Sequence, residues 1–166
     1  SAKRMAAMID DLVDSARLEA GQLEMRKQRT DLLQLISDLI ERVGMPGDRE
    51  RIRVEASEAV PAILAEQQRL ERAITNLLTN ALKYSPADKP VIIAIARQDE
   101  KAVVSVSDQG VGIPPEDLPH LFQRHFRAKT AAKQEGLGLG LYIPRLIVEA
   151  HGGMVGVESE VGKGST

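Results

Sequence analysis

The chain has 166 residues, 43% of them hydrophobic and 28% charged, which suffices for one domain with a hydrophobic core and one appended element. Its 22 basic and 24 acidic residues nearly cancel, so we expect no nucleic-acid partner and no membrane contact. The absence of cysteine excludes a disulfide framework and thiolate catalysis, and the three histidines stand too far apart for a metal cluster. No apolar run approaches the roughly 20 residues of a membrane-spanning helix. We therefore expect a cytoplasmic domain, and whether membrane spans precede Ser1 stays open.

Residues 1–43 contain one glycine and no proline, which favours helices. Between Met5 and Leu23, apolar residues recur every three or four positions and form one stripe along a helix predicted over residues 1–25. This helix opens without a capping residue and needs a partner helix. The stripe suits a helical hairpin or bundle, so we expect a fragment that begins inside an element and that, in the intact protein, forms a homodimer through this helix.

A second helix is predicted from Leu32 to Val43, with Thr30 or Asp31 as its N-cap and residues 44–47 as its end. Beyond it, strand and helix patterns alternate, and two of the strands form an antiparallel pair with a short polar connection. Helices beside antiparallel strands predict an α+β sandwich in which helices cover one face of a mixed sheet. The elements predicted after residue 47 are strands over 51–54 and 60–64, a helix over 66–83, the paired strands over 91–97 and 102–107, a proline-marked loop over 114–119, a helix from 141 to 150 and a strand over 154–159.

The helix over 66–83 carries a polar stripe on an otherwise apolar pattern. Asn76, Asn80 and either Lys83 or Tyr84 are three or four residues apart and share one face. Asparagine is a poor helix former, so the stripe is either ordinary surface polarity or a site. Amide oxygens beside a lysine suit a hydrated Mg²⁺ with phosphates.

Three further segments allow a binding role beside a plain structural one. Asp108 ends a strand ahead of Gly110 and Gly112, which is typical of a turn or of a pocket where a carboxylate accepts an exocyclic amine. Glycines at 136–140 precede a helix and offer backbone N–H groups to an anion. Residues 124–133 hold four cations and no acid, which suits a polyanion or a solvated loop. The dinucleotide and P-loop fingerprints are both absent by spacing.

Read together, five segments resemble, in the same order, the N, G1, F, G2 and G3 boxes of sensor histidine kinases. An earlier segment resembles the end of the second helix of that family's dimerisation domain. The resemblance implies that residues 1–28 end a dimerisation domain and that residues 29–166 form a catalytic ATP-binding domain of the GHKL, or Bergerat, fold. The boxes are Asn76–Ser85, Asp108–Pro114, Leu121–Arg127, Gly136–Gly140 and Gly162–Thr166, and the earlier segment is Leu12–Gly21.

The resemblance also implies a role for each box. Asn80 would hold Mg²⁺, Asp108 would accept the adenine amino group, and Asn76, Lys83 and Arg124 would act in catalysis. Arginines of the F box would lie in a lid over the triphosphate. The residues expected to bind the nucleotide are Asn76, Asn80, Lys83, Tyr84, Asp108, Gly110, Gly112, Ile113, Arg124, Arg127, Lys129, Gly136, Leu137, Gly138, Leu139, Gly140 and Thr166.

Asn76 bears on the reaction type, because related hydrolytic ATPases carry a glutamate there to activate water. An amide cannot take a proton at neutral pH, so we expect ATP to be held without rapid hydrolysis. The resemblance implies a protein histidine kinase that uses ATP and Mg²⁺. Its acceptor histidine would lie before Ser1, and a response-regulator aspartate would take the phosphate next. The alternatives are a non-catalytic nucleotide-sensing or scaffold module of the same fold and a hydrolytic ATPase.

Three positions depart from the family pattern. His125 stands where the F box usually has its second phenylalanine, which leaves the anchoring of the lid open. Pro144 follows the glycines closely and is tolerated only in the first turn of a helix, so we place the helix start near Leu141. The chain stops at Thr166 where the family continues into another strand, so one sheet edge is expected to be incomplete.

Overall fold

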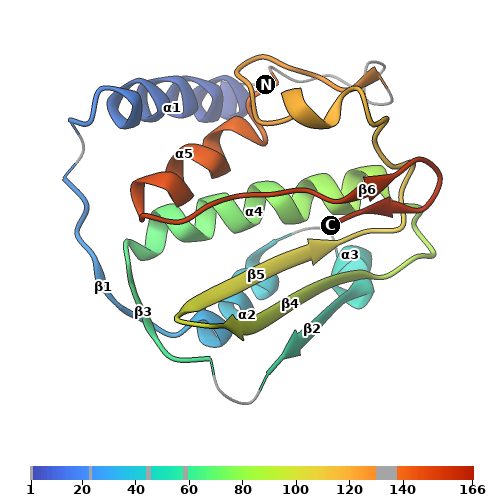
Figure 1. Ribbon diagram of the computed structural model, residues 1–166, viewed down its shortest axis with the longest axis horizontal. Coiled ribbons are helices and arrows are strands. Elements are labelled where there is room, and N and C mark those ends of the chain that lie inside the picture. The colour runs from blue at the N-terminus through green and yellow to red at the C-terminus, as the bar shows by residue number, and fades with distance from the viewer. Residues whose placement is uncertain (1, 23, 44–45, 58–59, 130–137) are drawn as a thin grey trace.

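A three-stranded mixed sheet forms one layer of the computed structural model, which describes residues 2–22, 24–43, 46–57, 60–129 and 138–166 (Figure 1). Strand β4 (Val91–Gln98) lies in the middle, parallel to β2 (Ile52–Ala56) and antiparallel to β5 (Lys101–Ser107). The inward positions of β4, which alternate along the strand, are fully buried. The predicted antiparallel pair and mixed sheet are confirmed.

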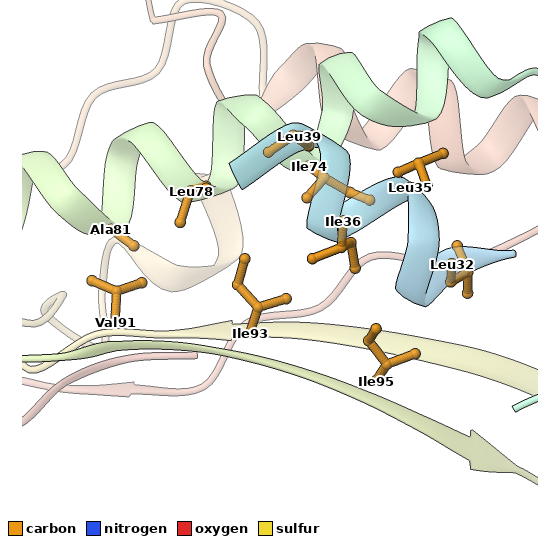
Figure 2. Packing of buried hydrophobic residues seen from close by; sticks show 10 residues of the cluster. All are labelled: Leu32, Leu35, Ile36, Leu39, Ile74, Leu78, Ala81, Val91, Ile93 and Ile95. Atoms are coloured by element: carbon orange, nitrogen blue, oxygen red, sulfur yellow. The ribbon is translucent and has the colours of Figure 1, made fainter. Parts of the chain in front are cut away.

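Helices α2 (Leu32–Arg42) and α4 (Gln67–Tyr84) cover one face of this sheet, as predicted (Figure 1). Figure 2 shows leucine and isoleucine side chains of both helices pointing at the inward face of β4. Asp31 is the N-cap of α2, because its Oδ1 accepts a hydrogen bond from the Gln34 N–H at 3.1 Å. The buried residues of this main core are Leu32, Leu35, Ile36, Leu39, Ile74, Leu78, Ala81, Val91, Ile93 and Ile95.

A second, smaller core lies on the other side of α4, between α1 (Ala2–Glu19) and α5 (Tyr142–Ala150). Ala73 of α4 packs there with Leu139, Ile143 and Ile147, and Leu12 of α1 covers the group. The N-terminal helix therefore packs on the same unit as α4 and α5, as Figure 1 shows.

The junction between α4 and α5 is fixed by His151, which follows α5. Its Nε2 accepts a hydrogen bond from the Glu66 N–H at 3.0 Å, so Nδ1 carries the proton and donates to the Ile147 carbonyl at 2.7 Å. Glu66 is the N-cap of α4 and its own side chain makes no capping hydrogen bond. The imidazole thus positions the start of α4 relative to the end of α5.

Short elements complete the fold. Strand β1 (Gln28–Thr30) pairs antiparallel with β3 (Ile63–Ala65), and β6 (Ser159–Glu160) pairs antiparallel with β7 (Gly164–Ser165). The remaining helices are α3 (Pro46–Arg51) and the 3₁₀ turn η1 (Leu118–His120). None of the helices in the described part of the chain is long and apolar enough to cross a membrane.

Some sequence-based boundaries were wrong. The strand predicted over 154–159 is extended and alternates in exposure, but a strand needs a ladder, and among its described residues only Glu158 and Ser159 pair with the C-terminal segment. The N–H groups of Glu158 and Thr166 each donate to the other's carbonyl, and Ser159 lies opposite Ser165. Residues 46–51 form α3 in place of a turn and the first residue of a strand, because Pro46 suits the first position of a helix. The strand predicted over 60–64 begins only at Ile63, opposite Thr30, and β1 was not predicted.

Candidate functional site

The polar stripe of α4 continues the face that packs against α5. Ala73, Asn80 and Tyr84 are seven and eleven residues apart, which places them on one side of the helix. Ala73 is buried beside α5, whereas Asn80 and Tyr84 lie further along and are only half-buried. The same face is therefore apolar where α5 covers it and polar beyond the start of α5.

Gly140 brings the glycine-rich segment against this stripe. A Cβ built on Gly140 would lie 3.3 Å from Asn80 Nδ2 and 3.6 Å from its Oδ1. The preceding residue, Leu139, is 4% exposed and packs in the second core, so only its backbone can face a ligand. Leu139 thus anchors the segment and sets Gly140 beside the Asn80 amide.

Gly110 brings the loop after β5 against the end of α4. A Cβ on Gly110 would lie 2.5 Å from the Tyr84 carbonyl oxygen, so the two backbones are in direct contact. The Gly110 N–H donates to Asp108 Oδ1 at 2.7 Å. Asp108 is therefore held about one helical turn beyond Asn80 along α4.

Burial raises the pKa of the Asp108 carboxyl above its usual range, and backbone hydrogen bonds from Gly110 and Ser165 oppose that rise. Of the acids that the structure describes, only Asp108 shows a resolved shift. A half-buried carboxylate with spare acceptor capacity is suited to a donor such as an amino group on a flat ring.

The C-terminal segment closes over Asp108. The Asp108 N–H donates to the Ser165 carbonyl at 2.9 Å, and a Cβ on Gly164, whose φ is +98°, would collide with the Asp108 carbonyl oxygen at 2.0 Å. Thr166 shares a hydrogen bond of 2.9 Å with Ser107 through their hydroxyl groups. Asp108 and these C-terminal residues line an open depression of about 340 Å³.

Ser159 orders the far side of this loop. Its hydroxyl accepts a hydrogen bond from the Ile113 N–H at 2.9 Å and donates to the Gly164 carbonyl at 2.9 Å. A Cβ on Gly112 would lie 2.1 Å from the Glu160 carbonyl oxygen, so these two segments also touch. Sequence reasoning missed Ser159, because a lone serine in a predicted strand carries no signal for such contacts.

The basic segment lies over the loop at 114–120. Lys129 donates from its backbone N–H to Asp117 Oδ2 at 2.8 Å, and its Nζ lies 3.4 Å from Glu116 Oε1. Arg124 and Arg127 are exposed. Asp117, which is 5% exposed, was also missed; its carboxylate ties the loop at 114–120 to the Lys129 backbone.

His125 occupies a strained backbone position. Its φ is +62°, and a Cβ on Gly138 would lie 2.7 Å from the His125 carbonyl carbon. Phe126 turns instead to His120, with ring centroids 5.6 Å apart. The departure from the family pattern at His125 thus coincides with a close backbone contact between the basic and the glycine-rich segments.

The structure thus links all five predicted segments through four contacts: Gly140 to Asn80, Gly110 to Tyr84, Gly164 to Asp108 and Gly138 to His125. Lys83 is exposed, with its Nζ 5.3 Å from the centre of the Tyr84 ring, and Asn76 is half-buried. Two predicted ligands, Gly136 and Leu137, lie outside the described residues.

The chain is similar to known proteins along most of its length. Residues 65–166 match the model of the histidine kinase-, DNA gyrase B-, and HSP90-like ATPase family. The adaptive-response sensory kinase SasA of Synechococcus sp. (strain JA-2-3B'a(2-13)) is 35% identical over 99% of this chain, which spans 44% of that protein. The chain therefore covers less than half the length of this curated relative.

Solved structures show the same relationship. Full-length ShkA in complex with AMPPNP superposes with a TM-score of 0.83 at 29% identity, over 98% of this chain and 34% of ShkA. The mycobacterial sensor histidine kinase MprB superposes with a TM-score of 0.71 at 32% identity, over 83% of this chain and 93% of the MprB chain. The expected α+β fold and family are confirmed: this chain belongs to the histidine kinase-, DNA gyrase B-, and HSP90-like ATPase family, in its histidine-kinase branch.

Proposed function

We propose that this chain binds ATP with Mg²⁺ and presents the γ-phosphate to a histidine of a dimerisation domain in the cytoplasm, from which it passes to a response-regulator aspartate. One observation carries the proposal: Gly140 and Gly110 both approach one face of α4, at Asn80 and at Tyr84. An elongated ligand along this face would meet an amide at one end and the Asp108 carboxylate at the other. In the intact protein, α1 would supply part of a homodimer interface.

The adenine would lie at the Asp108 end. The carboxylate would accept its amino group, while Gly110, Gly112 and Ile113 would supply backbone against the ring and Thr166 would border it. Glycine at 110 and 112 is required by the close contacts with Tyr84 and Glu160. A base with an exocyclic amine would be preferred, because only such a base donates to the acceptor capacity that the Gly110 N–H leaves on the half-buried Asp108 carboxylate.

The phosphates would lie toward the start of α5. Gly138 and Gly140, with Gly136 and the backbone of Leu137 and Leu139, would offer N–H groups, and α5 begins two residues after Gly140. Lys83, Tyr84 and Lys129 would contact phosphate or ribose. The exposed guanidinium groups of Arg124 and Arg127 would neutralise charge on the transferring phosphoryl group.

The donor set fits Mg²⁺. In the described residues no cluster of three His, Cys, Asp or Glu side chains forms a protein cage. Asn80 offers a neutral amide oxygen, which suits an ion that keeps several waters and takes its other ligands from substrate phosphates. When bound, the ion would neutralise phosphate charge.

Asn76 accounts for transfer without hydrolysis. It lies one turn before Asn80 on α4, and its backbone carbonyl accepts a hydrogen bond from the Thr79 hydroxyl at 3.2 Å. Its side-chain amide cannot remove a proton from water. The γ-phosphate would therefore be transferred to a histidine imidazole, whose nitrogen lone pair can attack phosphorus without a base to activate it.

Calorimetry with MgATP tests the proposal on wild type and on N80A and D108N, with D88N as the control because Asp88 is 76% exposed. We expect binding by wild type and D88N, loss in D108N, and an affinity in N80A that no longer responds to EDTA. Transfer is read as an acid-labile, alkali-stable phosphate on a dimerisation-domain histidine supplied in trans. Wild type that does not bind ATP would favour the scaffold alternative, and rapid phosphate release into solution would favour the hydrolytic one.

A further inference from the structure

Arg51, the last residue of α3, reaches the loop that follows α4. Its Nη2 donates to the Pro86 carbonyl at 2.8 Å and to the Ser85 carbonyl at 3.3 Å, and its Nε donates to the Lys89 carbonyl at 3.1 Å. Its Nη1 lies 3.6 Å from Asp48 Oδ1, and the side chain is only 13% exposed. One guanidinium thus holds three carbonyl groups of a single loop.

Sheet register explains why Arg51 stands there. β2 and β4 are parallel and Ile52 lies opposite Val91, so the residue before Ile52 lies beside the residues that lead into β4. In Figure 1, α3 lies at the same end of the sheet as the C-terminal end of α4. The Arg51 side chain therefore lies along the loop that connects α4 to β4.

Within the loop, the Lys89 N–H closes a turn by donating to the Pro86 carbonyl at 3.0 Å. The Ser85 N–H completes α4 by donating to the Ala81 carbonyl at 3.1 Å, but the buried Ser85 hydroxyl has no hydrogen-bond partner in the described structure. Pro86 has no N–H to donate. A helix end leaves carbonyl groups without partners, and a cation there is favourable. Arg51 places its guanidinium at this end of α4 and binds the carbonyl groups of Ser85 and Pro86, which follow the helix.

The loop at 85–89 starts directly after Tyr84, whose carbonyl contacts the adenine end of the candidate site. The carbonyl of Tyr84, directly before Ser85, is the atom that Gly110 touches, and the Gly110 N–H holds Asp108 Oδ1 at 2.7 Å. The loop that Arg51 holds is therefore connected to the Asp108 carboxylate through two contacts, that of the Tyr84 carbonyl with Gly110 and that of the Gly110 N–H with Asp108. A shift of the loop would move Tyr84 and, with it, the support of Asp108.

We propose that Arg51 is a positioning residue for nucleotide binding, because its fork on the loop at 85–89 sets the Tyr84 carbonyl against Gly110. The inference rests on the proposed function and adds to it a residue outside the five segments. It concerns the adenine end, so ATP and ADP should be affected equally. A residue that acted on the γ-phosphate would affect ATP alone.

The test replaces Arg51 by lysine, which keeps the charge and the aliphatic stem but loses the planar fork. R49K is the matched control, since Arg49 lies in the same helix and is exposed. Calorimetry measures the Kd of ATP and ADP for both variants, and NMR follows the Gly110 amide proton in the free proteins. We expect R51K to raise both Kd values about tenfold and to move the Gly110 amide resonance, because it loses hydrogen bonds from a charged group. R49K should change neither.

The outcomes separate the two proposals. If wild type binds no ATP, the proposed function fails before Arg51 is at issue. If wild type binds and R51K binds equally well, or if R51K weakens binding while the Gly110 resonance stays in place, the role of Arg51 is refuted. Should R51K unfold, R51Q takes its place, because glutamine still donates to one carbonyl, and the same two readouts decide.

Discussion

The carbonyl oxygen of Tyr84 lies against Gly110, with no room for a side chain between them. A Cβ at Gly110 would be 2.5 Å from that oxygen and 2.8 Å from Asp108 Oδ1. This contact joins the end of α4 to the loop that carries the acceptor carboxylate. The end of the helix therefore supports the loop that carries Asp108 through direct backbone contact.

We expect G110A to weaken nucleotide binding more than it weakens the fold. The added methyl group must push the loop away from Tyr84, at a cost of about 1–3 kcal/mol, and it displaces the N–H that holds Asp108. Calorimetry should show an increase of at least about tenfold in the Kd of ATP, which corresponds to about 1.4 kcal/mol. G156A is the control, because no atom lies within 4 Å of a Cβ there. Unchanged ATP affinity in G110A would contradict this geometry.

Asp108 gives nucleotide binding a pH dependence of known sign. Burial raises its pKa, so the free protein becomes more stable, as far as this group is concerned, when the pH falls through that raised value. An adenine amino group donates to the charged form, so the affinity for nucleotide should fall over the same range. Stability and affinity thus change in opposite directions.

The measurement is a series of Kd and Tm values from neutral pH downward. D108N has no carboxyl at this position to titrate, so subtracting its Tm profile from that of wild type isolates the contribution of the Asp108 carboxyl to stability. A wild-type Kd that stays constant over the pH range in which the Tm profiles of wild type and D108N diverge would show that the Asp108 carboxyl is not the acceptor.

Much of the fold could be predicted because it depends on local patterns. Helix α4 and the pair β4–β5 follow from apolar spacing and a polar connection between two strands. The strand expected over 154–159 was wrong because alternation decides which side chains face inward, whereas a ladder depends on a distant neighbour.

The residues of the site also fall into those that local sequence could predict and those that it could not. Asn80, Asp108 and Gly140 could be found because their residue types carry the chemistry and their motifs carry the family resemblance. Arg51 and Asp117 could not, because each acts through contacts set by the tertiary fold, Arg51 on the loop at 85–89 and Asp117 on the Lys129 backbone. An arginine that precedes a strand gives no sign that this strand pairs in parallel with β4, and it is this pairing that places Arg51 beside the loop.

Replacing Asn76 by glutamate should give the protein an ATP hydrolysis activity. Wild type should release phosphate from ATP at close to the background rate, because no base stands at this position to activate water. N76E places a carboxylate one turn before Asn80 on a helix that tolerates glutamate well, and we expect steady phosphate release to increase at least about tenfold. N76Q is the matched control, with the same length and no base. A wild type that already hydrolyses ATP rapidly would contradict the assignment of Asn76.

The contact between α1 and α4 predicts a measurable coupling between two charged residues. Asp14 Oδ2 pairs with Arg72 Nη1 and lies 3.7 Å from Arg69 Nη1, and all three side chains are partly covered, at 27%, 24% and 16% exposure. Burial lowers the pKa of the Arg72 guanidinium, and the negative charge of Asp10 opposes that shift. We expect D14N to lower the free energy of unfolding by about 1 kcal/mol, the upper end for a pair that water still reaches. Urea denaturation of D14N, R72M and the double variant gives the coupling energy, with D88N near zero as the exposed control. Additive single effects would mean that the pair does not hold α1 on α4, which would leave the apolar contact of Leu12 with the second core to do so.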